Sequence, residues 1–534
     1  PVRHPRSTMQ PEWALSPAPG QTQAVGRWKA AAGRLGRDAA TSDETLISVT
    51  KPLPGLRLLA AALLPAAVLL LPAAAATRPN ILLVIADDMS WEHTSIAGCQ
   101  GVNTPTIDRL ARSGVLMRNG FSGAPGCSPS RAALLTGRHL WMNEEAAVHF
   151  GGFPAKFPTF ADLLIKAGYH VGATGKPWSP GDASKHGRTT PPAGPMYNQH
   201  TLQPPSPNIK DNDYPANFAA FLAKRKPGQP FCFWYGSVEP HRGYDRGSGV
   251  RSGKRLEEVK VPAFLPDTPE VRSDLLDYFV EIEWLDTQLG RAIALLEKTG
   301  EMANTLIVFT ADNGMPMVRA KATCYEYGLH VPLVITWPQR IPGGRAVEDP
   351  VGFVDLSATL LAAAGVAHPH TADPALAPVG RNLLPILTTD KQGLVEPATA
   401  FTFAGHERHT LTRYNDLGYP IRALRTPQYL YLRNLRPERW PQGDPQRNGR
   451  PLHAGAYRDI DDQVLLRWLI DRAQTPPYDA FLARAVGRRP AEELYDIVQD
   501  PACLHNLATV PAHAAARARR SEEHTSELQS LTNL

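Results

Sequence analysis

Downstream of Arg78, unbroken apolar runs alternate along the chain with apolar stripes of helical spacing. Residues 81–86, 231–236 and 306–310 have the composition of buried strands, whereas 273–298 carries its apolar side chains on one helix face. Strands that alternate with helices predict an α/β fold, with a large, mostly parallel sheet sandwiched by helices. The other expected strands are 169–174 and 331–336, and the other expected helices are 105–111, 160–167 and the segment after Asp355.

The pattern changes beyond about Asp390, where the apolar runs become shorter and no longer alternate regularly with helices. This predicts one large domain over residues 78–388 and a smaller α+β subdomain over residues 389–512. The expected strands of the subdomain are 401–403, 423–425 and 429–434, and its helices lie around 461–472 and 480–485.

Residues 56–76 have the order of a secretory signal: positive charge, then an apolar stretch, then small residues. An uncleaved membrane anchor is the alternative, but two prolines and the alanine-rich end favour cleavage. We therefore expect export to the periplasm or the extracellular space, without a stable membrane anchor. Residues 1–55 lack any helical or strand period and are expected to be a non-native or disordered extension, with true initiation near Val49.

The other end of the chain is expected to be a tail over residues 513–534. Residues 520–530 resemble the translation of a common DNA-sequencing adapter. We therefore expect no packed role for residues 520–534.

Charge and cysteine content narrow the class of protein. The net charge of +5 is small for 534 residues and does not indicate a nucleic-acid partner. The five cysteines are too few and too scattered for a disulfide framework or a zinc site. They are Cys99, Cys127, Cys232, Cys324 and Cys503.

Polar residues directly follow four of the expected strands. An aspartate at the end of one strand is more often a turn or a helix cap, but ligands of open α/β sheets bind at the carboxyl ends of the strands. Four such coincidences on one edge therefore predict a site. The groups are Asp87-Asp88, Gly175-Lys176, Glu239-Pro240-His241 and Asp312-Asn313-Gly314.

The segment 127–138 reads CSPSRAALLTGR and places a cysteine at the expected mouth of a helix. There the helix dipole and the free N–H groups favour an anion, and Arg131 adds a cation. The phosphate loop of tyrosine phosphatases does not match, because it needs a longer spacing than the three residues between Cys127 and Arg131. The alternative is that Cys127 is an ordinary buried cysteine before a helix. That interpretation gives no reason for the presence of Arg131 and Arg138.

These residues resemble the type I sulfatase family of the alkaline phosphatase superfamily, whose signature is Cys-x-Pro-x-Arg followed by Thr-Gly-Arg. The resemblance covers residues from about 78 to 507. It implies an alkaline phosphatase-like fold and hydrolysis of sulfate esters or sulfamates. It also implies that a dedicated oxidase, a partner during maturation, converts Cys127 to formylglycine, the modified residue that supplies the nucleophile.

The resemblance further implies one Ca²⁺ per chain. Asp87, Asp88, Asp312 and Asn313 match the family's ligands, and the side chain at position 127 completes the shell. An all-oxygen shell suits a hard cation, whereas zinc or copper would favour histidine or cysteine.

Catalytic roles carry over to Cys127, Arg131, Lys176, His241 and Lys321. The three basic side chains Arg131, Lys176 and Lys321 would stabilise charge on the sulfuryl oxygens, and His241 would protonate the leaving atom. Trp178 departs from the pattern, because many sulfatases have a histidine there. We expect this difference to affect the rate and the substrate preference of the enzyme, but not the class of reaction that it catalyses.

Segments 239–242, 312–316, 405–409 and 419–422 resemble the heparan N-sulfatases within the family. This implies a sulfated saccharide substrate, first of all N-sulfoglucosamine of heparan- or heparin-type glycans. Substrate contacts would come from Glu407, Arg408, His409 and Arg422, for which ordinary surface polarity is the alternative.

Other functions stay open on the sequence alone. The enzyme alternatives are an O-sulfatase acting on another sugar or on aryl sulfates, and a phosphonate or phosphate ester hydrolase on the same fold. A catalytically inactive protein that binds sulfated glycans is disfavoured by the intact Cys127, Arg131 and metal ligands. The sequence also leaves open whether the chain forms a homodimer.

Overall fold

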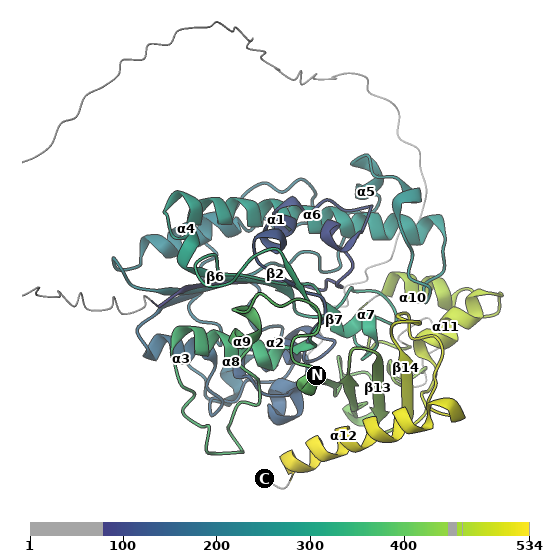
Figure 1. The fold of residues 1–534 in the computed structure, drawn as a ribbon. Helices are drawn as coiled ribbons and strands as arrows, with labels where there is room; N and C mark the ends of the chain where they lie inside the picture. Colours follow the sequence, from purple (N-terminus) through teal and green to yellow (C-terminus); the bar gives the residue numbers. More distant parts are fainter. Residues whose placement is uncertain (1–77, 447–455, 462, 533–534) are drawn as a thin grey trace, which may run out of the picture. The chain divides into compact units, whose positions relative to one another are not determined.

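The computed structural model describes residues 78–446, 456–461 and 463–532 (Figure 1). The expected extension over 1–55 and the expected signal over 56–76 lie outside the described residues. Among the helices of the described part of the chain, none combines the length and apolar character that crossing a membrane requires.

The core of the fold is a seven-stranded sheet of order β4-β5-β1-β6-β8-β2-β9. The interior strand β1 (Asn80–Ala86) pairs in parallel with β5 (Phe231–Gly236) and with β6 (Thr305–Ala311), and β4 (His170–Gly175) extends the parallel part beyond β5. Every residue of β1 is buried, as expected for a parallel strand covered on both faces. The prediction of a mostly parallel α/β sheet is thereby confirmed.

The expected strand 331–336 is in fact two strands in two sheets. β7 (His330–Val331) pairs with β3 (Gly120–Phe121) in a small sheet that also holds β10 (Val351–Gly352). β8 (Leu333–Thr336) runs antiparallel to β6 and to β2 (Val115–Met117). β9 (Arg345–Val347) pairs with β2 and forms the edge of the large sheet. Pro332 separates the two strands, because proline has no N–H to donate to a sheet ladder.

Helices cover both faces of the large sheet (Figure 1). One face carries α6 (Pro269–Lys298) with its neighbours α1 (Pro105–Ser113) and α4 (Tyr214–Ala223). The other face carries α2 (Cys127–Thr136), α3 (Phe160–Lys166) and α8 (Phe353–Ala364). Three further helices have only four residues each: α5 (Ser248–Arg251), α7 (Glu326–Leu329) and α9 (Leu384–Leu387).

Helix α6 begins before the expected residue 273, because a stronger start signal lies upstream. The Thr268 side chain accepts a hydrogen bond from the Val271 N–H, and Pro269 occupies the first turn, where a missing N–H costs nothing. The apolar stripe of the helix, which includes Leu275, is buried as the periodicity predicts.

The C-terminal part forms a smaller antiparallel sheet of order β11-β12-β13-β14 with helices of its own, which confirms the expected smaller α+β part of the fold. Its strands are β11 (Thr402–His406), β12 (Ile421–Arg425), β13 (Tyr429–Asn434) and β14 (Glu492–Asp496), and its helices are α10 (Gln463–Ile470) and α11 (Tyr478–Val486). The sequence pattern missed β14 because buried Glu493 interrupts its apolar pattern. This carboxylate accepts hydrogen bonds from the hydroxyls of Tyr325 and Tyr495.

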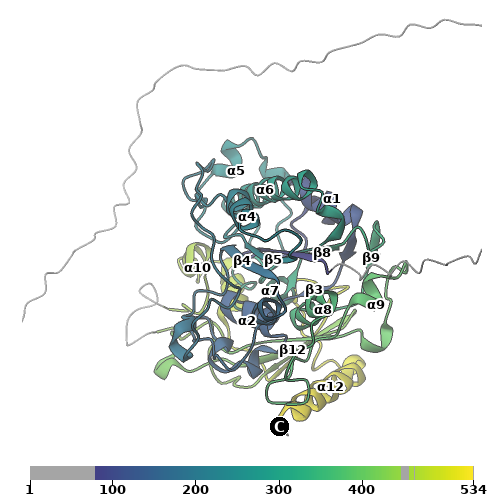
Figure 2. The same cartoon turned by 90° about the vertical axis from the view of Figure 1, so that its left-hand side faces the viewer.

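The expectation that residues 520–534 have no packed role was wrong. Residues 520–532 belong to α12 (Ala514–Thr532), which contacts β12 and β13 and lies beside β12 in Figure 2. His524 is 1% exposed with its ring centroid 5.8 Å from that of Tyr431, and Arg433 donates to the Thr525 hydroxyl at 3.4 Å. Helix-forming residues in 520–530 extend the Ala- and Arg-rich helix that begins upstream. The adapter origin of this segment stays a prediction.

A chain that ends at Arg519 should therefore be less stable than the full chain, because it loses the contacts of His524 and Thr525. We expect the melting temperature to fall by roughly 1–3 °C, because about 1 kcal/mol corresponds to only about 1 °C in a chain of this length. His524→Ala in the full chain, measured in the same thermal scan, isolates the contribution of the buried ring. Identical melting of the truncated and full chains would contradict the packed role.

Candidate active site

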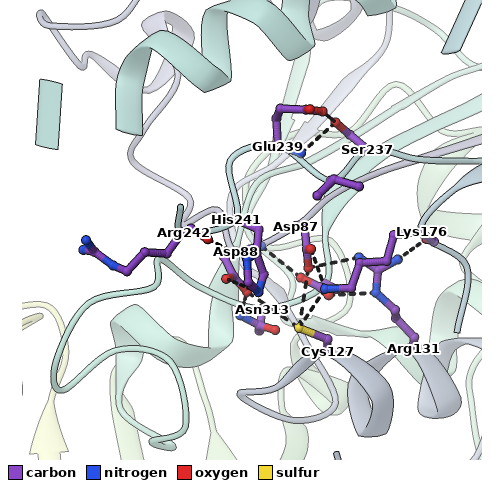
Figure 3. A network of polar contacts seen from close by, with 12 residues as sticks. Asp87, Asp88, Cys127, Arg131, Lys176, Ser237, Glu239, His241, Arg242 and Asn313 are labelled. Atoms are coloured by element: carbon purple, nitrogen blue, oxygen red, sulfur yellow. Dashed lines mark hydrogen bonds and ion pairs between the residues drawn. The ribbon is translucent and has the colours of Figure 1, made fainter. Parts of the chain in front are cut away.

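Four adjacent parallel strands deliver the predicted site residues to one edge of the sheet. Asp87 and Asp88 follow β1, Lys176 follows β4, His241 comes after β5, and Asp312 with Asn313 follows β6. Because β4, β5, β1 and β6 are consecutive in the sheet, their carboxyl ends meet. Figure 3 shows Asp87, Asp88, Asn313 and Cys127 turned toward one another, with Arg131 and Lys176 on one side and His241 on the other.

Cys127 is the first residue of α2 and points into this cluster. Its Sγ lies 3.5 Å from Asp87 Oδ1, 3.9 Å from Asp88 Oδ1 and 3.3 Å from Lys176 Nζ. The side chain is 0% exposed, and burial raises the pKa of the unmodified thiol well above its ordinary value. An unmodified Cys127 is therefore a neutral thiol at pH 7, and a thiol is a poor nucleophile compared with a thiolate.

Three cations balance three buried carboxylates around Cys127. Arg131 Nε donates to Asp312 at 2.8 Å and its Nη2 donates to Asp87 at 3.2 Å. Lys176 Nζ pairs with Asp87 at 2.5 Å, and Lys321 Nζ pairs with Asp88 at 2.8 Å. The other donors of Arg131 reach the backbone carbonyls of Lys176 and Pro177. Arg131 therefore orients the carboxylates from a fully buried position.

The carboxylates of this cluster differ in their proton affinity. Although burial opposes ionisation, Lys176, His241 and Arg131 hold the pKa of Asp87 well below its usual range. The pKa of Asp312 is instead raised to about 7, because burial and the charges of Asp87 and Asp88 outweigh the attraction of Arg131. The proton affinity of Asp312 is thus much higher than that of Asp87.

The same residues fit a hard divalent cation. Ligand atoms of Asp87, Asp88, Cys127 and Asp312 all lie within 4.8 Å of one another. Asn313 donates through Nδ2 to Asp88 at 2.8 Å, whereas its buried Oδ1 has no hydrogen-bond partner among the residues that the structure describes. An orphaned amide oxygen beside three carboxylates provides the oxygen ligands that Ca²⁺ prefers.

His241 is held in one tautomer at the edge of the cluster. Its Nδ1 lies 3.0 Å from the Arg242 carbonyl, which can only accept, so Nδ1 carries the proton. Nε2 then faces the cluster, 3.8 Å from Asp88 Oδ2. Burial and the neighbouring Lys321 hold the pKa of His241 below its ordinary value.

Trp178 performs a packing task where the family pattern has a histidine. Its Nε1 donates to the Ser128 carbonyl at 2.9 Å, and its ring meets Phe153 edge-to-face. The side chain therefore braces the first turn of α2, and its one polar hydrogen is directed at a backbone oxygen of that turn.

Asp461 is a site residue that sequence reasoning missed. Its Oδ1 accepts from His409 Nε2 at 2.6 Å, and its Oδ2 forms an ion pair with Lys321 and lies 3.9 Å from His241 Nε2. No local signal could have found it, because Asp461 precedes α10 in an irregular segment and meets the cluster only in the folded chain.

The four expected substrate contacts occupy different surroundings. Buried His409 lies next to the cluster through Asp461, whereas Glu407 and Arg422 pair with each other at 2.7 Å. Arg422 also stacks over the Trp141 ring, with 4.8 Å from its guanidinium carbon to the centroid, and Arg408 is half-buried. Their contact with substrate stays a prediction.

A cavity of about 960 Å³ opens onto the cluster. Asp87, Lys176 and His241 form its floor, and residues between Gln203 and Asp211 form part of its wall. Its volume is at the upper end of the range for small-molecule sites. Asp87, Lys176 and His241 thus face a space large enough for a monosaccharide.

Comparison with known proteins identifies the family. A family model described as Sulfatase matches residues 79–366. Human N-sulphoglucosamine sulphohydrolase is 28% identical over 467 residues, which cover 82% of this chain and 87% of that protein. An ulvan-active sulfatase of Formosa agariphila is 27% identical over 446 residues, covering 82% of this chain and 78% of that protein.

A solved phosphonate monoester hydrolase of Silicibacter pomeroyi superposes with a TM-score of 0.57 at 20% identity, covering 85% of this chain and 95% of that one. This similarity shows a shared fold, whereas the family match and the named sulfatase relatives decide the reaction class. The chain therefore belongs to the sulfatase family and is a sulfuric ester hydrolase.

Proposed function

We propose that this sulfatase acts on N-sulfoglucosamine of heparan- or heparin-type saccharides, with a formylglycine at position 127 and one Ca²⁺. The observation that carries the proposal is the placement of Cys127 at the start of α2, between Lys176 Nζ at 3.3 Å and Asp87 Oδ1 at 3.5 Å. A nucleophile at this position is flanked by a cation on one side and by the predicted metal ligands on the other.

Formylglycine would supply an oxygen nucleophile that, unlike a thiol, can be regenerated after each turnover. Lys176 and Lys321 contribute positive charge next to position 127, where charge-assisted hydrogen bonds can hold sulfuryl oxygens. Arg131 keeps Asp87 and Asp312 in place from behind. Because its donors reach these ligands and two backbone carbonyls, Arg131 would position the ligands, in contrast to the sulfuryl contact expected from the sequence.

Asp87, Asp88, Asp312 and Asn313 would hold the Ca²⁺, together with the side chain at position 127. The support is the convergence of the buried ligand atoms and the unpartnered Asn313 Oδ1. A divalent cation there would supply Lewis-acid stabilisation of the sulfuryl group.

His241 would deliver a proton to the leaving atom in its protonated, imidazolium form, in which Nε2 carries the second proton. Its Nδ1–H is bound to the Arg242 carbonyl, so Nε2 is the nitrogen that faces the site. The leaving nitrogen of a sulfamate has to be protonated as its bond to sulfur breaks, so a positioned acid matters more there than for an aryl sulfate.

The choice of N-sulfoglucosamine rests on the relatives and on the motifs around His241 and Asn313. The human relative is named for this substrate, but the ulvan-active sulfatase is nearly as similar. An O-sulfated sugar is therefore the competing substrate class. Residues Glu407, Arg408, His409 and Arg422 are proposed to orient the sugar.

Turnover on a matched panel decides between these substrates. We expect kcat/KM for N-sulfoglucosamine to exceed that for glucosamine 6-sulfate at least about tenfold, the ratio that one well-placed charged hydrogen bond can supply. Sulfate release from N-sulfated, 6-O-sulfated and 2-O-sulfated sugars, and from an aryl sulfate, is measured at one enzyme concentration. A hundredfold preference for the 6-O-sulfate would refute N-sulfoglucosamine as the substrate and leave the sulfatase assignment intact.

Maturation and location complete the proposal. A partner oxidase would act on Cys127, and the enzyme would be exported by way of the apolar segment 56–76. Mass spectrometry of the mature chain, isolated from the periplasm or the medium, tests both points.

A further inference from the structure

Asp461 places a carboxylate beside three groups of the site. Its Oδ2 pairs with Lys321 Nζ and lies 3.9 Å from His241 Nε2, and its Oδ1 accepts from His409 at 2.6 Å. Lys321 and His409 are almost fully buried, whereas 22% of the Asp461 side chain is exposed. Asp461 and His241, whose side chain is 33% exposed, are therefore the members of this group that solvent and a ligand can reach.

The carboxylate is both charged and fixed. Although burial opposes ionisation, His409 and Lys321 hold the pKa of Asp461 well below its usual range. One hydrogen bond or ion pair to each oxygen sets the orientation of the group. Because a carboxylate offers about four lone-pair positions, each oxygen retains capacity for a ligand.

The products of the two candidate reactions differ in charge. Hydrolysis of a sulfamate converts R–NH–SO₃⁻ and H₂O into R–NH₃⁺ and SO₄²⁻, with the electron pair of the broken S–N bond left on nitrogen. Hydrolysis of a sulfate ester converts R–O–SO₃⁻ and H₂O into R–OH, SO₄²⁻ and H⁺. Only the sulfamate yields a leaving group that becomes a cation, and a fixed carboxylate next to it favours that cation.

We propose that Asp461 is a specificity-determining residue that binds the leaving nitrogen of an amino sugar and thereby selects N-sulfated over O-sulfated substrates. An atom that accepts a proton from His241 Nε2 lies within reach of Asp461 Oδ2, because these two groups are 3.9 Å apart. This inference rests on the proposed function and adds to it the residue that recognises the nitrogen.

The test compares glucosamine with glucose as ligands of the wild-type protein and of Asp461→Asn, by calorimetry or NMR titration at pH 7. We expect the wild-type protein to bind glucosamine at least about tenfold more tightly than glucose, because the ammonium group adds a charge-assisted bond. Asp461→Asn should bind the two sugars equally. This binding readout does not depend on modification of Cys127.

Turnover supplies the second measurement. In Asp461→Asn the ratio of kcat/KM for N-sulfoglucosamine to that for glucose 6-sulfate should fall at least about tenfold, whereas Asp461→Glu should retain most of the ratio because it keeps the charge. Thermal unfolding of each variant checks that the fold is intact.

Two results would overturn the inference. One is equal binding of glucosamine and glucose by the wild-type protein. The other is an Asp461→Asn variant that keeps the glucosamine preference, or that loses both activities in equal proportion, as a residue that only positions Lys321 would. A wild-type protein that prefers glucosamine but does not hydrolyse N-sulfoglucosamine would instead refute the proposed substrate alone.

Discussion

Cys127→Ala should lower sulfatase turnover by about 10³-fold or more, because it removes the side chain from which the nucleophile is made. The Sγ it deletes is the atom that lies between Lys176 and the aspartates of the site. The measurement is sulfate release by purified wild-type and variant proteins at equal concentration. Circular dichroism and thermal unfolding should show that the fold is retained.

The matched control is Cys232→Ala, which deletes another buried thiol. Cys232 lies in strand β5 of the large sheet, outside the charged cluster. This variant should keep near-normal turnover. In the active wild-type protein, peptide mass spectrometry should show residue 127 lighter than cysteine by about 18 Da, the change from –CH₂SH to –CHO. Full activity in a protein with only unmodified cysteine would refute the formylglycine mechanism.

Asp312→Asn should lower both calcium affinity and turnover by about 100-fold. The substitution keeps the shape but removes the charge that Arg131 Nε and the Asp88 N–H both contact. It takes one negative ligand from the cation and leaves the buried Arg131 guanidinium with one carboxylate partner fewer, so stability should fall as well. Calcium binding is measured by calorimetry, and turnover is measured before and after chelation and re-addition of Ca²⁺.

Asp286→Asn is the control that distinguishes weaker calcium binding from a general loss of stability in Asp312→Asn. Asp286 is a buried carboxylate that accepts hydrogen bonds from the N–H groups of Thr106 and Ile107 at the start of α1. The control variant should melt at a lower temperature but bind Ca²⁺ normally. Unchanged turnover after chelation, together with near-normal activity of Asp312→Asn, would refute the calcium site.

The sequence predicted the parts of the molecule whose signals are local. The apolar run of β1 and the polar pair Asp87-Asp88 directly after it both lie within one short segment, and the same holds for β6 with Asp312-Asn313. Because parallel neighbouring strands end at one edge, the local signals were enough to predict that these side chains meet.

What the sequence could not predict depends on contacts between distant segments. Asp461 reaches Lys321 only when the C-terminal part packs against the large domain, and it meets His409 across 52 residues, so no periodicity marks it. The charged residue Glu493 hid β14 because one of its tyrosine partners, Tyr325, is remote in the chain. His524 looked like part of a solvated tail, since nothing in its neighbourhood indicates that it packs against Tyr431.

The complete burial of Cys127 has a consequence for the timing of maturation. β1 cannot reach its final pairing until β6 has been synthesised, and Asp312, which follows β6, belongs to the shell around Cys127. Since the folded chain leaves Cys127 0% exposed, the proposed oxidase would have access to it in the interval before these distant strands associate. Pairing between segments so far apart in sequence is slow. On the proposed mechanism, late pairing of the strands would therefore prolong the interval in which Cys127 can be modified, and variants that fold faster should be modified less completely.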